Sequence, residues 1–210
     1  MTVYNKTAIG VGAVLALAAG FWLYTRYEIV KAAAIEKQKT ATAVFIQARV
    51  AGLIKPEDFT GGDPAAQRKV FEAFFDAVQS PNLVRMKVWN RNFTVVWSNL
   101  PELIGQRFPD NHEVEESFEG KVEFEIEKPK TENVLERQYQ ELSELYVPIS
   151  NAKGEVAGVI EVYQPTFSLY REINAGFRRR LVPALVLFLA AYLLILFVLG
   201  RFLKPSQSRE

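Results

Sequence analysis

AIGVGAVLALAAGFWLY at Ala8–Tyr24 and LVPALVLFLAAYLLILFVLG at Leu181–Gly200 are two apolar stretches near the ends of the chain. Neither contains a charged residue, and basic residues flank both. At about 1.5 Å of rise per residue, the longer stretch spans the roughly 30 Å hydrocarbon core of a bilayer, and the first is slightly shorter. The two stretches therefore predict two transmembrane helices, with the charged segment between them on one side of the membrane.

We expect the chain to divide into four segments, of which the second is long enough for one compact domain. They are a tail with the first transmembrane helix (1–27), the central domain (28–180), the second transmembrane helix (181–200) and a short tail (201–210).

The first apolar stretch has a cleaved signal peptide as its alternative interpretation. The bulky residues of Phe21–Tyr24 stand where a cleavage site would need small residues, which favours an uncleaved anchor. Small residues also recur every four positions along this stretch and predict a helix-packing surface, although Ala and Gly are common in such helices in any case. These residues are Ala8, Gly12, Ala16 and Gly20.

The central segment changes from helical to strand patterns along its length. Glu28–Leu53 has no proline and is rich in Ala, Lys and Glu, so it predicts a long helix that continues from the first apolar stretch. Asp63 and Pro64 provide a cap and a first helical residue for a second helix over Ala65–Val78. Alternating apolar residues then predict five antiparallel strands, at Val84–Trp89, Phe93–Ser98, Lys121–Glu127, Leu145–Ile149 and Val156–Tyr163.

These elements predict an α+β domain in which a long N-terminal helix packs on a five-stranded antiparallel sheet. We expect its core between helices and sheet to include Phe71, Phe74, Phe124 and Val159. A last helix over Thr166–Arg180 should lead into the second apolar stretch, where Pro183 predicts a kink or a break.

Composition and motifs exclude several classes of function. The net charge of +1 and the lack of a basic stripe argue against a nucleic-acid partner. The chain has no cysteine and one histidine, His112, so we expect no metal site and no cofactor. Asp110 and His112 form a conceivable acid–base pair, but Asp110-Asn111-His112 is better explained as the cap of a short helix. We therefore expect no enzymatic activity and no catalytic residue.

The domain resembles the extracytoplasmic single-Cache (PAS-like) sensor domains of bacterial histidine kinases and chemoreceptors. The residues that carry the resemblance follow the long helix and the short helix in order: Val84–Trp89, Val95–Ser98, Leu103–Phe108, Leu145–Ile149 and Gly158–Tyr163. The resemblance covers roughly 28–180 and the two flanking spans. It implies a periplasmic domain, both termini in the cytoplasm, an inner-membrane location, a ligand pocket on the sheet face away from the long helix, and dimerisation through the membrane-proximal helices.

Flanking charges do not determine this orientation, because basic residues are slightly more numerous on the domain side of the two spans. The rule relating such charges to topology applies to short loops, and long domains cross membranes largely regardless of charge. After the second span, Arg201–Pro205 resembles the start of a HAMP linker, and the polar residues that follow favour a complete protein over a sensor fragment.

The resemblance places a ligand pocket on the sheet and on the loop that crosses it. Candidate pocket residues are Arg85, Lys87, Trp89, Trp97, Arg107, Tyr146 and Gln164. Arg85, Lys87 and Trp89 share one strand face, and a cation beside an aromatic ring can bind a small carboxylate. In the alternative, Arg85 and Lys87 face solvent and pair with the glutamates of Lys121–Glu127.

Residues 113–144 contain eleven acidic and four basic residues, with an exposed loop expected at Lys128–Asn133. Such a run is either a solvated face or a surface that attracts a basic partner. Two functions remain: a membrane-anchored sensor input that binds a small ligand and acts through partner proteins, or an accessory structural subunit of a large respiratory or photosynthetic membrane complex, recruited from a sensor ancestor. An open polar pocket would favour the first, and a pocket filled by the protein's own side chains would favour the second.

Overall fold

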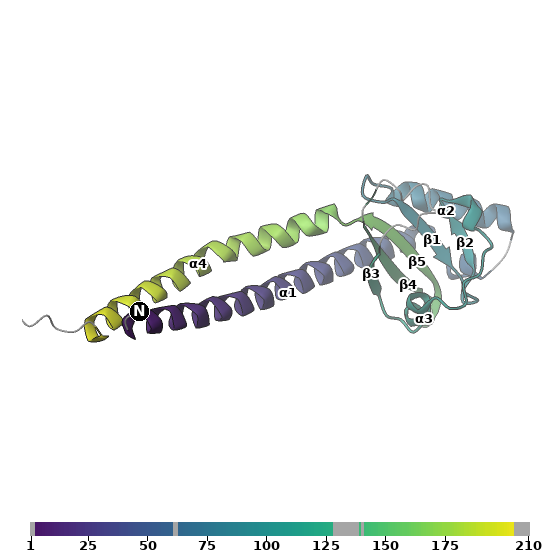
Figure 1. The fold of residues 1–210 in the computed structure, drawn as a ribbon. Coiled ribbons are helices and arrows are strands. Elements are labelled where there is room, and N and C mark those ends of the chain that lie inside the picture. The colour runs from purple at the N-terminus through teal and green to yellow at the C-terminus, as the bar shows by residue number, and fades with distance from the viewer. Residues whose placement is uncertain (1–2, 61–62, 128–138, 140, 204–210) are drawn as a thin grey trace, which may run out of the picture. The chain divides into compact units, whose positions relative to one another are not determined.

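The computed structural model describes residues 3–60, 63–127, 139 and 141–203. The chain forms two compact units, Met1–Ile35 with Leu169–Glu210 and Glu36–Ser168, and each is described by itself. The elements in chain order are α1 (Val3–Leu53), η1 (Pro56–Phe59), α2 (Pro64–Val78), β1 (Arg85–Trp89), β2 (Val95–Ser98), η2 (Pro101–Leu103), α3 (His112–Phe118), β3 (Glu123–Glu127), β4 (Leu142–Ser150), β5 (Val156–Pro165) and α4 (Phe167–Leu203) (Figure 1).

The unit Glu36–Ser168 contains one five-stranded antiparallel sheet with the strand order β2-β1-β5-β4-β3. The predicted α+β class and the five strands are confirmed, with β4 longer than expected at both ends. β5 lies at the centre of the sheet, where Lys87 of β1 and Tyr146 of β4 both pair with Glu161. This register decides which side chains share a face.

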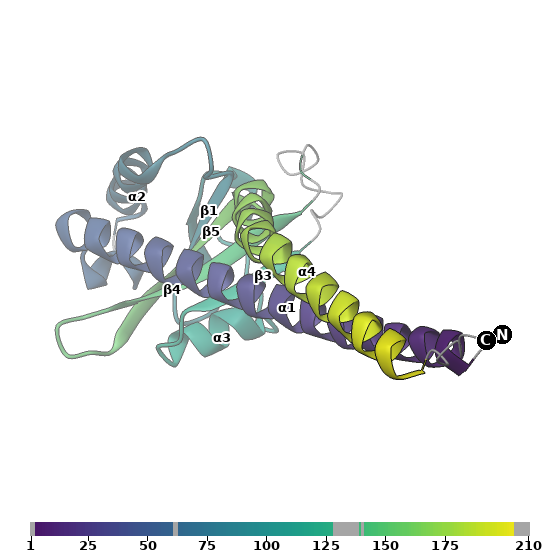
Figure 2. The ribbon, with the colours of Figure 1, turned by 90° about the vertical axis from the view of Figure 1, so that its left-hand side faces the viewer.

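The C-terminal part of α1 runs across one face of the sheet (Figure 2). This face carries the main apolar core. Ile46 and Val50, from the C-terminal part of α1, pack there together with Phe71 and Phe74 of α2. The prediction that the long helix packs on the sheet is therefore confirmed. Asp63 caps α2 as expected, because its side chain accepts a hydrogen bond from the Ala65 amide at 3.1 Å.

The other face of the sheet is covered by α3. A second apolar cluster joins Val114 of α3 to Trp89, Val95 and Val159. Val159 is buried as predicted, but on this face and not under the long helix, because its partner in the register is Trp89. Asn111 caps α3 by accepting from the Val114 amide at 2.8 Å, which confirms the capping interpretation of this segment.

Gly158 of β5 allows a close approach between the sheet and the loop after α1. A Cβ at this position would lie 1.9 Å from the ring of Phe59, which is fully buried on the α1 side of the sheet. Phe59 also stacks edge-on against Phe71, with ring centroids 5.6 Å apart. The absence of a side chain at Gly158 thus lets η1 close over the core.

The other unit contains the N-terminal part of α1 and most of α4. Both helices are long and apolar enough to cross a membrane by length and composition. They contact each other through Gly12 and Tyr192, and through Trp22 and Phe188, whose ring centroids lie 6.2 Å apart. A kink or a break was predicted at Pro183, and α4 continues through this residue without a break.

The four small residues of α1 do not all face α4. A Cβ on Gly12 would lie 3.3 Å from the Tyr192 hydroxyl, whereas one on Gly20 would meet nothing within 4 Å. The helix advances by about 100° per residue, so each step of four residues drifts by about 40°. The side of α1 that faces α4 therefore shifts along the helix, and Gly12, Leu15, Ala16 and Ala19 border an apolar cavity of about 410 Å³ between the helices. Of the predicted packing residues, Gly12 and Ala16 line this cavity, and Ala8 is buried.

Two expectations from the sequence lie outside the described residues. These are the exposed loop at Lys128–Asn133 and the polar tail that follows Lys204.

Replacing Gly158 with Ala should lower the free energy of unfolding by about 1–3 kcal/mol, because the new methyl group displaces the Phe59 ring from a packed core. Gly52→Ala is the matched control, since an added Cβ there meets nothing and alanine favours helices. Denaturant unfolding monitored by tryptophan fluorescence measures both. Equal stability of the two variants would contradict the described packing.

Replacing Gly12 with Leu should separate α1 from α4, because the larger side chain meets the Tyr192 ring. The cysteine-free chain permits disulfide cross-linking between Leu15→Cys and Leu189→Cys, which line the same cavity. We expect Gly12→Leu to reduce the cross-linking yield and Gly20→Leu to leave it unchanged. The reverse order would show that the contact lies on a different side of α1.

Candidate functional site

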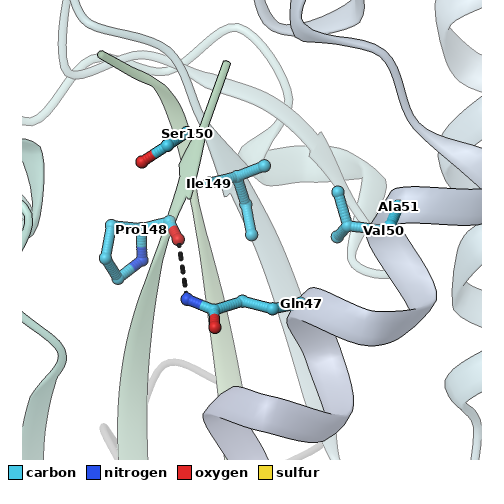
Figure 3. Close-up of a pocket in the computed structure, with 6 residues that line it drawn as sticks. All are labelled: Gln47, Val50, Ala51, Pro148, Ile149 and Ser150. Carbon is cyan, nitrogen blue, oxygen red and sulfur yellow. Dashed lines mark hydrogen bonds between the residues drawn. The ribbon is translucent and has the colours of Figure 1, made fainter. Parts of the chain in front are cut away.

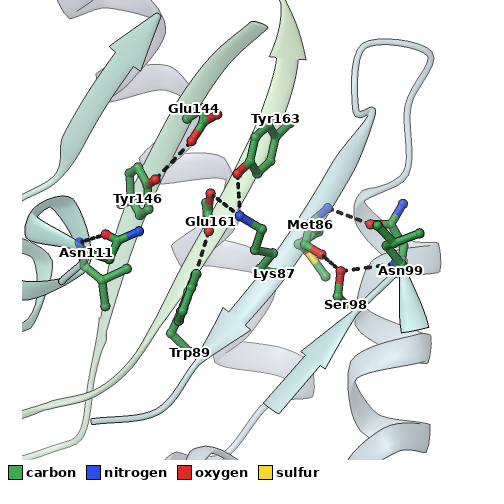
Figure 4. Close-up of polar contacts among 12 residues, drawn as sticks. Met86, Lys87, Trp89, Ser98, Asn99, Asn111, Glu144, Tyr146, Glu161 and Tyr163 are labelled. Carbon is green, nitrogen blue, oxygen red and sulfur yellow. Dashed lines mark hydrogen bonds and ion pairs between the residues drawn. The ribbon is translucent and has the colours of Figure 1, made fainter. Parts of the chain in front are cut away.

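A group of buried polar and aromatic side chains lies on the sheet face that α3 covers (Figure 4). We refer to these residues as the polar cluster. Three come from β1, two from β5 and two from β4, and each strand contributes alternate positions, so all point to one face. They are Arg85, Lys87, Trp89, Glu161, Tyr163, Glu144 and Tyr146.

Glu161 is the centre of the polar cluster. Its side chain is fully buried, and both carboxylate oxygens accept hydrogen bonds from β1. The Lys87 ammonium lies 3.0 Å from Oε1, and the Trp89 indole nitrogen donates to Oε2 at 2.7 Å. Lys87, whose side chain is 12% exposed, also donates to the Tyr163 hydroxyl. The Glu161 carboxylate thus accepts two charge-assisted hydrogen bonds, one from an ammonium group and one from an indole N–H.

The two tyrosines extend the polar cluster to either side of Glu161. Tyr146 donates to the Glu144 carboxylate at 3.0 Å. Burial raises the pKa of Tyr146 and of Tyr163 well above the usual range, and the nearby charges of Glu161 and Glu144 act in the same direction. Both phenols therefore stay protonated at neutral pH. The Arg85 guanidinium lies over the Tyr163 ring, 5.4 Å from its centroid.

Four of the seven residues proposed from the sequence lie together in the polar cluster: Arg85, Lys87, Trp89 and Tyr146. Arg85 is buried and only 12% of the Lys87 side chain is exposed, so the alternative in which both face solvent is wrong. The carboxylate that pairs with Lys87 belongs to β5. An ordinary surface ion pair does not describe this geometry.

The other three proposed residues lie elsewhere. Trp97 pairs with Val88, so it points to the α1 face, where it packs on Phe75 with ring centroids 5.5 Å apart. Gln164 also faces α1 and accepts from the Gln38 amide at 2.8 Å. Arg107 is exposed at the β2 edge and donates to the Asn92 carbonyl. Pairing register separates these residues from the polar cluster.

Sequence reasoning missed Glu161, Tyr163 and Glu144. A charged residue between Ile160 and Val162, in a strand that is otherwise apolar, was the available signal for Glu161. A buried central strand places such a residue in the protein interior, where it needs a partner. Recognition of Lys87 as that partner required the β1–β5 register, which pairs these strands although they are far apart in the sequence.

A second feature of this unit is a groove of about 340 Å³ between α1 and the end of β4 (Figure 3). Gln47, Val50 and Ala51 line one side, and Pro148, Ile149 and Ser150 line the other. The Gln47 amide donates to the Pro148 carbonyl at 3.3 Å across it. The groove lies on the α1 side of the sheet and contains no charged side chain, so it offers little for anchoring a charged ligand.

Surface charges in the described part of the acidic run form local pairs. Lys121 donates to Glu116 at 2.9 Å, and this bond lowers the pKa of Glu116 and raises that of Lys121. Within the described residues, no three histidine, aspartate or glutamate side chains come close enough to hold a metal ion.

Comparison with known proteins gives similarity of structure only. No family model and no curated protein matches the sequence. The sensor domain of the V. cholerae histidine kinase DctB is 16% identical with a TM-score of 0.47, over 80% of this chain and 60% of that one. The ligand-binding domain of the Campylobacter jejuni chemoreceptor Tlp3, in complex with 4-methylisoleucine, is 11% identical with a TM-score of 0.46, over 75% of this chain and 63% of that one.

An extracellular ligand-binding receptor from Desulfohalobium retbaense is 16% identical with a TM-score of 0.43, over 72% of this chain and 26% of the other. The chain thus spans less than two thirds of the length of each of these three structures. The first two belong to a histidine kinase and a chemoreceptor, the classes of protein whose sensor domains the sequence motifs resemble. At TM-scores below 0.5, the likeness gives no correspondence between individual residues.

Removal of one member of the Lys87–Glu161 pair should lower the free energy of unfolding more than removal of both members. Glu161→Gln or Lys87→Met alone leaves a buried charge without its counterion and should lower the free energy of unfolding by about 3–5 kcal/mol. The double variant should recover a large part of this loss. Denaturant unfolding of the four proteins measures the coupling energy, and strictly additive losses would show that the two side chains do not interact.

Proposed function

We propose that this chain is a non-enzymatic, membrane-anchored protein whose central domain lies outside the cytoplasm and acts as a small-ligand sensor input through a partner protein. The observation that supports the proposal is the polar cluster, in which Arg85, Glu144 and Glu161 are buried on one sheet face beside the largely buried Lys87. Buried ionisable groups are costly to desolvate, and they concentrate at functional sites more often than chance.

The apolar helices support membrane anchoring. Large side chains such as Leu17, Leu187 and Phe197 are between 64% and 76% exposed in the helical unit. Water would oppose the exposure of so many apolar side chains, whereas lipid would solvate them. Two spans would place both ends of the described chain on the same side and the sheet domain on the other, in the two-pass inner-membrane topology with a periplasmic domain.

Chain connectivity supports a signalling role. α1 is one helix from Val3 to Leu53, so the apolar N-terminal part and the part that packs on the sheet are covalently continuous. β5, which carries Glu161, ends at Pro165, and α4 begins at Phe167. A change at the polar cluster therefore has a short covalent route into an apolar helix, and the receiving module would belong to a partner or a second copy.

The chemistry of the polar cluster favours a small carboxylate as the ligand class. Lys87 and Trp89 supply an ammonium and an indole N–H on the same strand face, and both already bind the carboxylate of Glu161. A ligand with a carboxylate and an apolar body would meet the same donors beside aromatic rings.

The occupied state of the polar cluster favours a second candidate function. Glu161 fills the position between Lys87 and Trp89 with the protein's own side chain. This arrangement is the one expected of an accessory subunit of a large membrane complex that no longer binds a ligand.

Purification from native membranes in mild detergent distinguishes the two functions. A sensor input should purify alone or with a signalling protein. Recovery of a stoichiometric respiratory or photosynthetic complex would contradict the sensor function and support the structural one.

The orientation can be tested with one cysteine in the cysteine-free chain. Lys153 lies exposed in the turn between β4 and β5, so Lys153→Cys should react in intact cells with a maleimide that crosses the outer membrane but not the inner one. Ser117→Cys is the matched control, since Ser117 is fully buried and should react only after denaturation. Labelling of Lys153→Cys only after lysis would place the domain in the cytoplasm.

A further inference from the structure

We propose that the β1 donors of the polar cluster form a carboxylate-binding site that is closed by an internal occupant, the side chain of Glu161. This site rests on the proposed sensor function, and the contact of Glu161 with Lys87 and Trp89 would regulate ligand binding in it. Glu161 would compete with any carboxylate ligand, so the described state is an autoinhibited one.

The geometry of Glu161 is that of a bound ligand carboxylate. Each oxygen has its own donor, with Lys87 Nζ at 3.0 Å from Oε1 and Trp89 Nε1 at 2.7 Å from Oε2 (Figure 4). Both donors come from β1, and the carboxylate reaches them from the neighbouring strand. The donors would therefore remain in place if the acid came from another molecule.

The burial of Glu161 indicates that its ion pair with Lys87 does more than stabilise the fold. A Lys–Glu pair directly across two strands normally faces solvent and contributes little, whereas Glu161 is fully buried here. A buried ion pair is often no more stabilising than an apolar pair of the same volume. The same face also holds Arg85, Glu144 and two tyrosines, so the fold retains a whole set of buried polar groups where an apolar surface would suffice.

The formal charges on this sheet face indicate that Glu161 and a ligand carboxylate exclude each other. Arg85 and Lys87 bring two formal positive charges and Glu144 and Glu161 bring two negative ones, and Glu125 of β3 lies opposite Glu144 on the same face. The face therefore has no surplus positive charge for an additional carboxylate, which would be buried without a counterion unless Glu161 moves away. A ligand acid must therefore replace Glu161 and not join it.

The test removes the occupant and supplies carboxylates from solution. The full chain is purified in detergent as the wild type, Glu161→Ala, Glu161→Ala with Lys87→Met, and Val159→Ala. The last is the matched control, because Val159 is fully buried on the same face but carries no charge. Unfolding temperatures are measured as acetate, and separately butyrate, replaces chloride at constant ionic strength.

We expect Glu161→Ala to lose thermal stability and to recover at least half of the loss with saturating acetate and also with butyrate. The wild type, Val159→Ala and the double variant should respond to these anions no more than to chloride. If Glu161→Ala is unfolded in chloride, circular dichroism reports whether acetate restores its fold, and failure to restore it contradicts the proposal.

Two further outcomes would overturn the proposal. If acetate but not butyrate raises the unfolding temperature of Glu161→Ala, the anion only refills the volume of the deleted side chain. If both anions raise the unfolding temperature of the double variant as much as that of Glu161→Ala, Lys87 does not bind the anion. The experiment uses no partner protein, so a closed carboxylate site can be found even if purification from native membranes rejects the sensor function.

Discussion

The buried carboxylate of Glu161 is the constraint on which the sheet domain depends. A charge in the protein interior is tolerated only with hydrogen-bonding partners, and Lys87 and Trp89 provide them. This requirement fixes the register of β1 against β5, because a slip of one residue would turn Lys87 to the α1 face and bring Val88 towards Glu161. The apolar core on the opposite face depends on the same register, since Met86 and Val88 alternate with Lys87.

β5 connects the two faces of the sheet and the helical unit. On the α1 side, Gly158 leaves room for Phe59, and on the α3 side Glu161 organises the polar cluster. The strand then leads through Thr166 into α4, one of two helices apolar enough to cross a membrane. Displacement of Glu161 would therefore alter the strand that has the most direct covalent connection to the apolar helices. This arrangement links the proposed gate to the proposed signalling role.

Hydrophobic periodicity predicted the fold because each strand alternates and each helix repeats its apolar residues. The polar cluster was only partly predictable. Lys87 and Trp89 share a strand, so local alternation placed them together, whereas Trp97 and Gln164 were misplaced because their faces depend on pairing with other strands. Glu161 required the pairing of two strands distant in sequence. Gly20 does not meet α4, since a spacing of four residues drifts away from one helix face, and its predicted role in helix packing stays a prediction.

The hydrogen bond from the Trp89 indole to Glu161 can be measured in solution. Isotope labelling of the three tryptophans allows the exchange of each indole N–H with deuterium to be followed by NMR. We expect the Trp89 indole proton to be protected in the wild type and to exchange much faster in Glu161→Ala, while that of Trp97, on the other sheet face, keeps its rate. Rapid exchange at Trp89 in the wild type, or an unchanged rate in Glu161→Ala, would contradict a structure organised around this carboxylate.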